Sequence, residues 1–105
     1  MSASEVMTPG TPINLELTLA NTEYSLTLPA GCKFASGSVF NSGRTARVAF
    51  RYAFVTGKVA TPTSPWLTGL AGDFFHTPEK FCAAGLTVYF ASASAGAIVE
   101  VETWS

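Results

Sequence analysis

The feature of this sequence that most constrains its fold is a strict alternation of apolar and polar residues in short runs. From Ile13 to Leu19 every odd-numbered residue is apolar and every even-numbered one is polar, and the pattern returns in Tyr24–Leu28. A period of two places one set of side chains on each face of an extended chain, which is typical of a half-buried β-strand. No segment shows the 3.6-residue period of an amphipathic helix. The pattern therefore predicts an all-β protein.

Further strands are expected where alternation recurs between turn signals. The predicted strands are Ile13–Leu19, Tyr24–Leu28, Cys32–Phe40, Ala46–Val55, Leu86–Ala91 and Ala97–Trp104, with brief strands around Trp66-Leu67 and Phe74-Phe75. A turn signal at Asn21-Thr22 predicts that the first two strands form an antiparallel hairpin. Cys32–Phe40 is expected to be a weaker strand and Ala46–Val55 the strongest. In the last strand, the pattern predicts that Val99 and Val101 face away from Glu100 and Glu102.

The number of strands and their spacing indicate the architecture. Seven or eight strands of roughly 5–6 residues fit the chain, and turn signals recur roughly every 8–12 residues, as in a sandwich or small barrel. We predict one antiparallel β-sandwich domain over residues 13–105, jelly-roll-like and with negligible helix. Residues 1–12 contain Pro9, Gly10 and Pro12 and are expected to form an extended arm. This arm is either a frayed end or a segment that lies on a neighbouring subunit.

The low charge of the chain bears on how its surface is covered. Only 12% of the 105 residues are charged, the formal net charge is −1 and the mean hydropathy is +0.30. A small domain usually keeps itself soluble with charge at roughly a quarter to a third of its surface positions. Either small polar residues cover this surface, or part of it is buried against other chains, and the two explanations can coexist. Large apolar patches usually mark interfaces, which favours a protein partner.

The same composition excludes several classes of function. A net charge near zero gives no general attraction to nucleic acid or to an anionic membrane. No apolar run approaches the roughly 18 residues of a membrane span, and Met1–Pro12 lacks the regions of a signal peptide. We therefore expect a protein kept in a cytosol, with Cys32 and Cys82 reduced; a disulfide between them is the alternative.

The sequence offers few groups for catalysis or for binding a cofactor. One histidine and two distant cysteines form no zinc pattern, and there is no phosphate-binding glycine motif. His76 follows Asp73 at a distance that allows a hydrogen bond, but no nucleophile elbow accompanies them. We expect these two residues to lie in a surface loop and to contact each other only locally. We predict a protein that is not an enzyme and needs no metal or cofactor.

Five residues are the candidates for contact with a partner: Arg44, Arg47, Arg51, Trp66 and Trp104. Arg47 and Arg51 are four residues apart on a predicted strand, so both are expected on one sheet face, with Arg44 in the preceding turn. This basic group is expected to pair with Glu100 or Glu102 across strands, or with acidic residues of a partner protein; nucleic acid is the least favoured option. Trp66 and Trp104 are large anchors that pack either in the core or at an interface.

Two segments of the chain resemble small virion proteins of tailed bacteriophages. The first is YSLTLPAGCKF, residues 24–34, continued by the basic strand around Arg44 and Arg47. The second runs from LTVYFAS, residues 86–92, through Ala95-Gly96 to VEVETW, residues 99–104. The resemblance covers roughly residues 13–105, and it is loose over the proline-rich residues 58–80.

The resemblance implies a structural role in the phage head. Such proteins are small β-sandwiches that act as capsid decoration or cement subunits, bind the major capsid protein on the capsid exterior and commonly form trimers. The implied location is the virion, with assembly in the host cytoplasm. The matching segments contain no catalytic residues, so none is implied here.

Two other functions remain open at this stage. One is a receptor- or carbohydrate-binding module of a virion fibre or tail, in which Trp66, Phe74 and Phe75 form a stacking platform. The other is a small hydrolase that uses His76 and Asp73.

Overall fold

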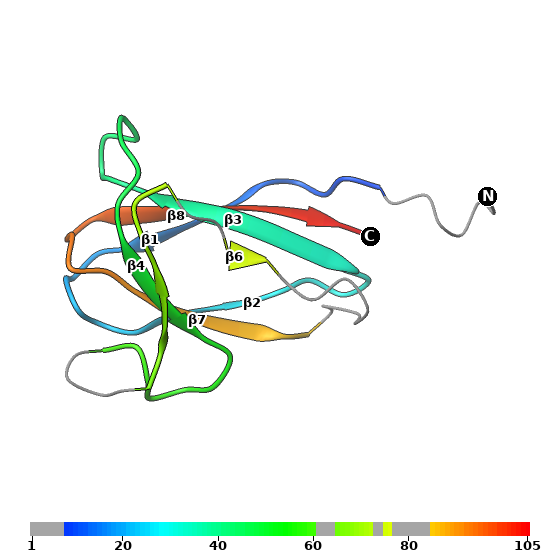
Figure 1. The fold of residues 1–105 in the computed structure, drawn as a ribbon. Helices are drawn as coiled ribbons and strands as arrows, with labels where there is room; N and C mark the ends of the chain where they lie inside the picture. The colour runs from blue at the N-terminus through cyan, green and yellow to red at the C-terminus, as the bar shows by residue number, and fades with distance from the viewer. Residues whose placement is uncertain (1–7, 61–64, 73–74, 77–84) are drawn as a thin grey trace.

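The computed structural model describes residues 8–60, 65–72, 75–76 and 85–105, and in this part of the chain no residue is helical. Two four-stranded antiparallel sheets face each other (Figure 1). The strands are β1 (Ile13–Leu17), β2 (Tyr24–Thr27), β3 (Phe34–Phe40), β4 (Phe50–Ala53), β5 (Leu67–Gly69), β6 (Phe75–His76), β7 (Thr87–Ala91) and β8 (Ala97–Trp104). The predicted antiparallel β-sandwich is confirmed.

The order of the strands is that of a jelly roll. Sheet A has the order β1-β8-β3-β6 and sheet B the order β2-β7-β4-β5. Successive strands along the chain lie in opposite sheets, except for β4 and β5, which pair within sheet B. Two Greek keys generate this interleaved pattern. Most neighbours within a sheet come from distant parts of the sequence, as in the pair β3 and β8.

The core lies between the sheets and is built by the alternating residues that the sequence marked as apolar. Leu17, Val39, Phe50, Phe90 and Val99 are at most 2% exposed and belong to one cluster. In β8 the burial alternates along its whole length, with Val99 inside and Glu102 outside. The predicted faces of the last strand are confirmed, because a period of two leaves only one way to bury its valines.

The predicted hairpin of the first two strands is wrong. β1 pairs with β8 in sheet A, whereas β2 pairs with β7 in sheet B. The connection from Thr18 to Glu23 crosses between the sheets, and at its end the Tyr24 hydroxyl accepts a hydrogen bond from the Leu19 amide at 3.0 Å. The crossing lets both strands bury their apolar faces in the common core from opposite sides.

The relative strengths predicted for the middle strands are reversed. β3 runs for seven residues in the interior of sheet A, while β4 contains only four of the ten residues predicted. Before β4 the chain still lies against β3, where Arg47 bridges to Phe40. Gly37 does not weaken β3, because a residue without a side chain fits where β3 is buried.

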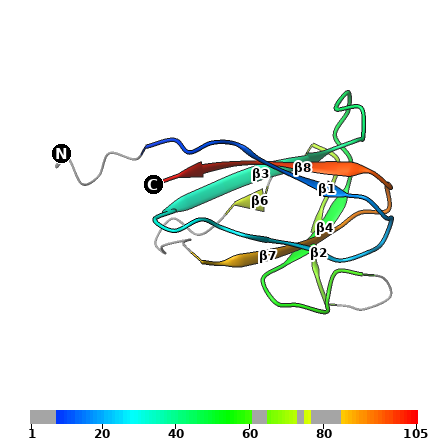
Figure 2. The ribbon, with the colours of Figure 1, turned by 180° about the vertical axis from the view of Figure 1, so that it is seen from behind.

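Residues 8–10 lie beside the end of β8, as the paths in Figures 1 and 2 show. The Gly10 amide donates to the Thr103 carbonyl at 2.8 Å, the Ser105 amide donates to the Thr8 carbonyl at 2.9 Å, and Pro9 lies opposite Trp104. From the pair Ile13–Val101 to the pair Pro9–Trp104 the arm takes four steps and β8 takes three. This extra residue is a β-bulge, and residues 1–7 of the predicted arm lie outside the described residues.

Candidate interaction surface

The outward side chains of sheet A form a face with a polar centre and apolar borders. The registers of β8 with β1 and β3 align these side chains in rows across the strands. The rows are Glu16–Ile98–Phe40, Asn14–Glu100–Ser38, Glu102–Ser36 and Trp104–Phe34. Directly opposed residues of an antiparallel pair share a face, so two polar rows lie between two rows that contain aromatic side chains.

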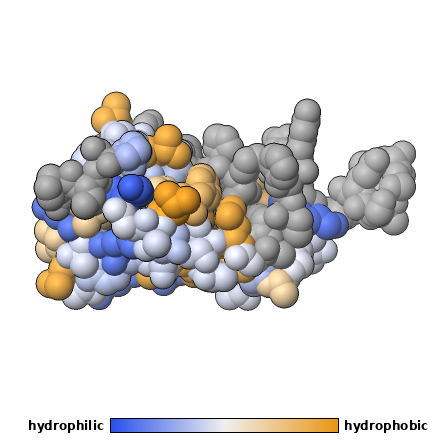
Figure 3. Space-filling view, turned by 90° about the horizontal axis from the view of Figure 1, so that it is seen from below, coloured by the Kyte–Doolittle hydropathy of each residue, from blue (hydrophilic) through white to orange (hydrophobic). Residues whose placement is uncertain are grey.

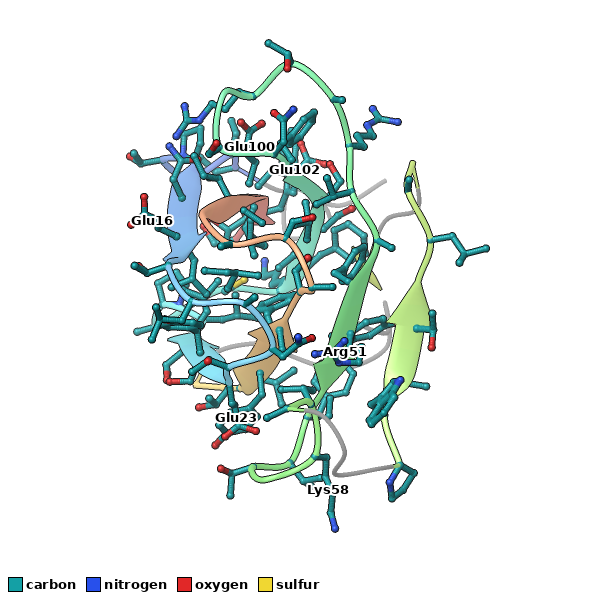
Figure 4. The ribbon with its side chains drawn as sticks, turned by 90° about the vertical axis from the view of Figure 1, so that its left-hand side faces the viewer. Glu16, Glu23, Arg51, Lys58, Glu100 and Glu102 are labelled. Atoms are coloured by element: carbon teal, nitrogen blue, oxygen red, sulfur yellow. The ribbon has the colours of Figure 1, made fainter. Side chains whose placement is uncertain are left out.

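A shallow groove of about 320 Å³ follows the two polar rows. Its lining includes Asn14, Ser36, Ser38, Phe40, Glu100 and Glu102. We call it the sheet A groove. Figure 4 shows Glu100 and Glu102 beside each other, on the side of the molecule that carries sheet A.

Arg44 and Arg47 lie at one end of the sheet A groove. The Arg44 Nε atom is 3.6 Å from an oxygen of Glu100, and both side chains are substantially exposed, at 48% and 36%. The Arg47 guanidinium lies 5.8 Å from the centre of the Phe40 ring. Asn41 shapes the turn that carries them by accepting hydrogen bonds from the amides of Arg44 and Thr45 at 2.9 and 2.8 Å. Exposed ion pairs add little stability, so Arg44 can exchange Glu100 for another partner.

Arg51 lies elsewhere, on the outer face of sheet B (Figure 4). The prediction that Arg47 and Arg51 share one sheet face is wrong, because the chain crosses from β3 to sheet B between them. The Arg51 Nε donates to the Val59 carbonyl at 2.6 Å and its terminal nitrogen donates to Asn21 Oδ1 at 2.9 Å. Burial lowers the pKa of the Arg51 guanidinium. Arg51 therefore acts within its own chain and holds a loop in place.

Trp66 belongs to a second, smaller apolar cluster on the outside of sheet B. Val59 is fully buried there against Ala53 and Ala91, and Trp66 and Tyr89 pack on this cluster. The Arg51 guanidinium lies 5.3 Å from the centre of the Trp66 ring, which is typical of a cation–π contact. Trp66 is therefore half-buried, and the contacts described here are with residues of its own chain.

Trp104 lies on the outer face of sheet A and not in the central cluster. It is half-buried between Phe34 on β3 and Pro9 on the arm. Core packing, one of the two environments expected for this tryptophan, is not observed; contact with a partner stays a prediction. Its ring adds to the apolar border of the face that also carries the sheet A groove.

Of the residues considered for catalysis, the structure describes His76 but not Asp73. His76 lies in β6 opposite Ser36, whereas Asp73, Phe74 and Cys82 lie outside the described residues. Cys32 is buried, and its thiol donates to the Phe34 carbonyl at 3.4 Å. Within residues 8–60, 65–72, 75–76 and 85–105, no three histidine, cysteine or acidic side chains come together as metal ligands. In the same ranges no helix is long and apolar enough to cross a membrane.

Large apolar side chains are also exposed away from the sheet A groove. They are Leu19, Val55, Leu67 and Leu70, at 49–64% exposure. Figure 3 views the molecule from the side of sheet B and shows scattered apolar patches among pale, near-neutral residues. The described surface is therefore covered in part by small polar side chains and in part by exposed apolar ones.

The sequence interpretation missed Ser38 and Asn14 as members of a surface site. The signal was present in Cys32–Phe40, where Phe34, Ser36, Ser38 and Phe40 alternate with smaller residues or valine. The identity of the neighbouring strands was needed as well, because the acidic side chains of the groove come from β8.

Comparisons with known proteins found no match: no protein-family model fits the chain, and neither the curated proteins nor the solved structures contain a significant relative.

Proposed function

We propose that the chain is a structural protein of a phage virion, a capsid decoration subunit that binds the major capsid protein on the outside of the shell. The observation that supports it is a surface too weakly charged for its size. With 12% charged residues and Leu19, Val55, Leu67 and Leu70 exposed, the domain gains by covering its surface with other proteins.

The two faces of the sandwich contribute differently to this proposal. The outer face of sheet B is partly covered by residues of the same chain. Val59 and Trp66 pack on it, and Arg51 contacts both of them. The outer face of sheet A has no comparable cover among the described residues, and Arg44, Arg47 and Trp104 lie on it or at its edge. We therefore assign contact with the shell to this face. A cement protein of this kind works by burying area, and specific interfaces bury about 1,200–2,000 Å².

The test is binding to shells assembled from the major capsid protein alone. Purified protein is added to these shells, which are pelleted and then challenged by heat and by low salt. We expect co-sedimentation and greater resistance of the decorated shells. Shells that neither bind the protein nor gain resistance would contradict the proposal.

Two variants show whether the face of sheet A makes the contact. Arg47→Ala removes a side chain at the groove and is expected to weaken binding to the shell several-fold, because rim charges tune association. Thr27→Ala, on the exposed outer side of β2 in sheet B, is the matched control and is expected to bind normally. Arg51 is unsuitable for this test, because its replacement is expected to loosen the loop that it holds.

A further inference from the structure

The sheet A groove contains a buried hydroxyl that the fold does not use. Ser38 is 6% exposed, and its side chain makes no hydrogen bond with any described residue. In the described part of the chain, every buried side-chain nitrogen or oxygen that is sealed from solvent has a partner. The Ser38 hydroxyl is therefore not sealed, and it opens into the groove that it lines. A ligand in the groove can therefore donate a hydrogen bond to this hydroxyl in place of water.

Two carboxylates of the neighbouring strand β8 lie next to this hydroxyl. Glu100 lies directly opposite Ser38, and Glu102 lies opposite Ser36. Glu100 and Glu102 are two residues apart on one strand, so they point the same way at a spacing of about 7 Å. Glu102 is exposed and forms no ion pair with a described residue, which leaves one negative charge in the groove without a counter-charge.

One basic side chain of the same chain already pairs with a carboxylate of the groove. Arg44 reaches Glu100 from the neighbouring turn, but its 3.6 Å distance is longer than the 2.7–2.9 Å of a strong charge-assisted hydrogen bond. The Phe40 ring and Pro12 line the groove as well. Apolar walls beside carboxylates suit the methylene stem and charged head of a lysine or arginine side chain.

We propose that the sheet A groove binds a lysine- or arginine-bearing segment of a partner protein. The basic side chain donates to Glu102 and Glu100, and Ser38 and Asn14 provide further polar contacts along the floor. The identity of the partner as the capsid shell rests on the proposed function, whereas the chemistry of the groove does not. The paired carboxylates repel phosphate, so a nucleic acid does not fit this site.

The experiment uses the tetrapeptide tetralysine as the probe, titrated into the ¹⁵N-labelled protein at low ionic strength. We expect the amide signals of Ser36, Ser38, Glu100 and Glu102 to shift on binding. The double variant E100Q/E102Q keeps the shape of the side chains and is expected to bind on the order of tenfold more weakly, because close charge pairs dominate such contacts.

Two further variants make the test specific. Glu16→Gln removes the same charge from the same face of sheet A but outside the groove lining, and it is expected to leave binding within about twofold. Arg44→Gln releases Glu100 from its internal partner and is expected to tighten tetralysine binding about threefold. If tetralysine were attracted only by acidic surface in general, E16Q would instead weaken binding about as much per charge removed as E100Q/E102Q does.

The outcomes separate this proposal from the proposed function. If tetralysine shifts no groove signals, or if maltotetraose shifts them and tetralysine does not, the groove is not a site for basic side chains. If shells bind E100Q/E102Q as well as E16Q, the groove proposal fails while the decoration role stands. If the protein binds tetralysine at the groove but no shells, the groove proposal stands and the decoration role fails.

Discussion

Arg51 ties together three parts of the chain that are far apart in sequence. Its guanidinium contacts the Val59 carbonyl, the Asn21 side chain and the Trp66 ring. The alternation of apolar and polar residues predicted that Arg51 points away from the core. It could not predict the partners, because Asn21 and Val59 lie in loops whose paths depend on packing and not on local pattern.

Replacing Arg51 by glutamine should destabilise the protein by about 2 kcal/mol, because hydrogen bonds from a charged donor are lost in a partly buried setting. The free energy of unfolding from urea denaturation measures this effect. Arg47→Gln is the matched control, and it should cost less than about 1 kcal/mol because this side chain is exposed and a cation–π contact of the kind it makes with Phe40 is weak at an exposed site. Equal losses in the two variants would contradict the bracing role of Arg51.

The contribution of Arg51 should not depend on pH in the usual range. Its pKa is lowered by burial, so folding favours the neutral form slightly and stability would rise only as the pH approaches that pKa. Arginine remains protonated well above neutral pH. We expect the difference in unfolding free energy between wild type and Arg51→Gln to stay constant from about pH 5 to 9.

Gly69 illustrates a residue fixed by close approach. It lies opposite Phe50 in sheet B, and a Cβ atom there would come within 2.3 Å of the Phe50 ring. Gly69→Ala should therefore destabilise the fold by about 1–3 kcal/mol, as overpacking does. Gly43→Ala, whose Cβ would meet nothing closer than 3.9 Å, should change the melting temperature little. A normal melting temperature for Gly69→Ala would show that the core yields more than the geometry implies.

At the scale of elements, the segment 54–60 covers the outer face of sheet B and is fastened by one carboxylate. Glu23 accepts hydrogen bonds from the Thr56 hydroxyl and the Gly57 amide, both at 2.8 Å. These bonds join the connection between β1 and β2 to the loop that follows β4. The loop thereby keeps Val59 in the small cluster.

Glu23→Gln should loosen this loop without unfolding the sandwich. The amide of Gly57 is expected to exchange with deuterium at least about tenfold faster, because local opening governs exchange in loops. Amides of β8 should exchange as in the wild type, and Glu16→Gln should leave Gly57 protected. Faster exchange throughout the protein would instead indicate a global role for Glu23.

The positions of the strands could be predicted from the sequence, but their pairing could not. The positions of β1, β2, β7 and β8 follow from alternation, which is a local property. The pairing of β1 with β8 and of β2 with β7 is not local, and the short connection Thr18–Glu23 made a hairpin look natural. β4 likewise ends at Ala53, where the chain continues into the segment 54–60 that packs over sheet B.

At the scale of the molecule, the candidate site was anticipated only in its parts. Arg44 pairs with Glu100 as expected for within-chain pairing, and Trp104 lies on the same face as Glu100 and Glu102. The groove itself could not be predicted, since it needs β3 and β8 side by side. A sequence pattern assigns side chains to a face, but the neighbours on that face are chosen by the topology.

A self-associating subunit is expected from the proposed function. Sedimentation equilibrium should give a mass near three times the 11.0 kDa of the chain, because decoration subunits of the resembling kind commonly form trimers. Leu70→Glu places a charge on an exposed apolar position and tests whether this part of the surface is buried on association. A wild-type protein that remains a monomer at every concentration would contradict the expectation.

The position of β8 has a consequence for how this protein is made. β8 lies between β1 and β3 in sheet A, yet of the eight described strands of the sandwich it is the one synthesised last. Until Ala97–Trp104 emerge, β1 and β3 have no strand to join them, and the nascent polypeptide exposes their unpaired edges. Such long-range pairing slows folding and invites aggregation, so chaperones that hold unfinished chains should raise its yield.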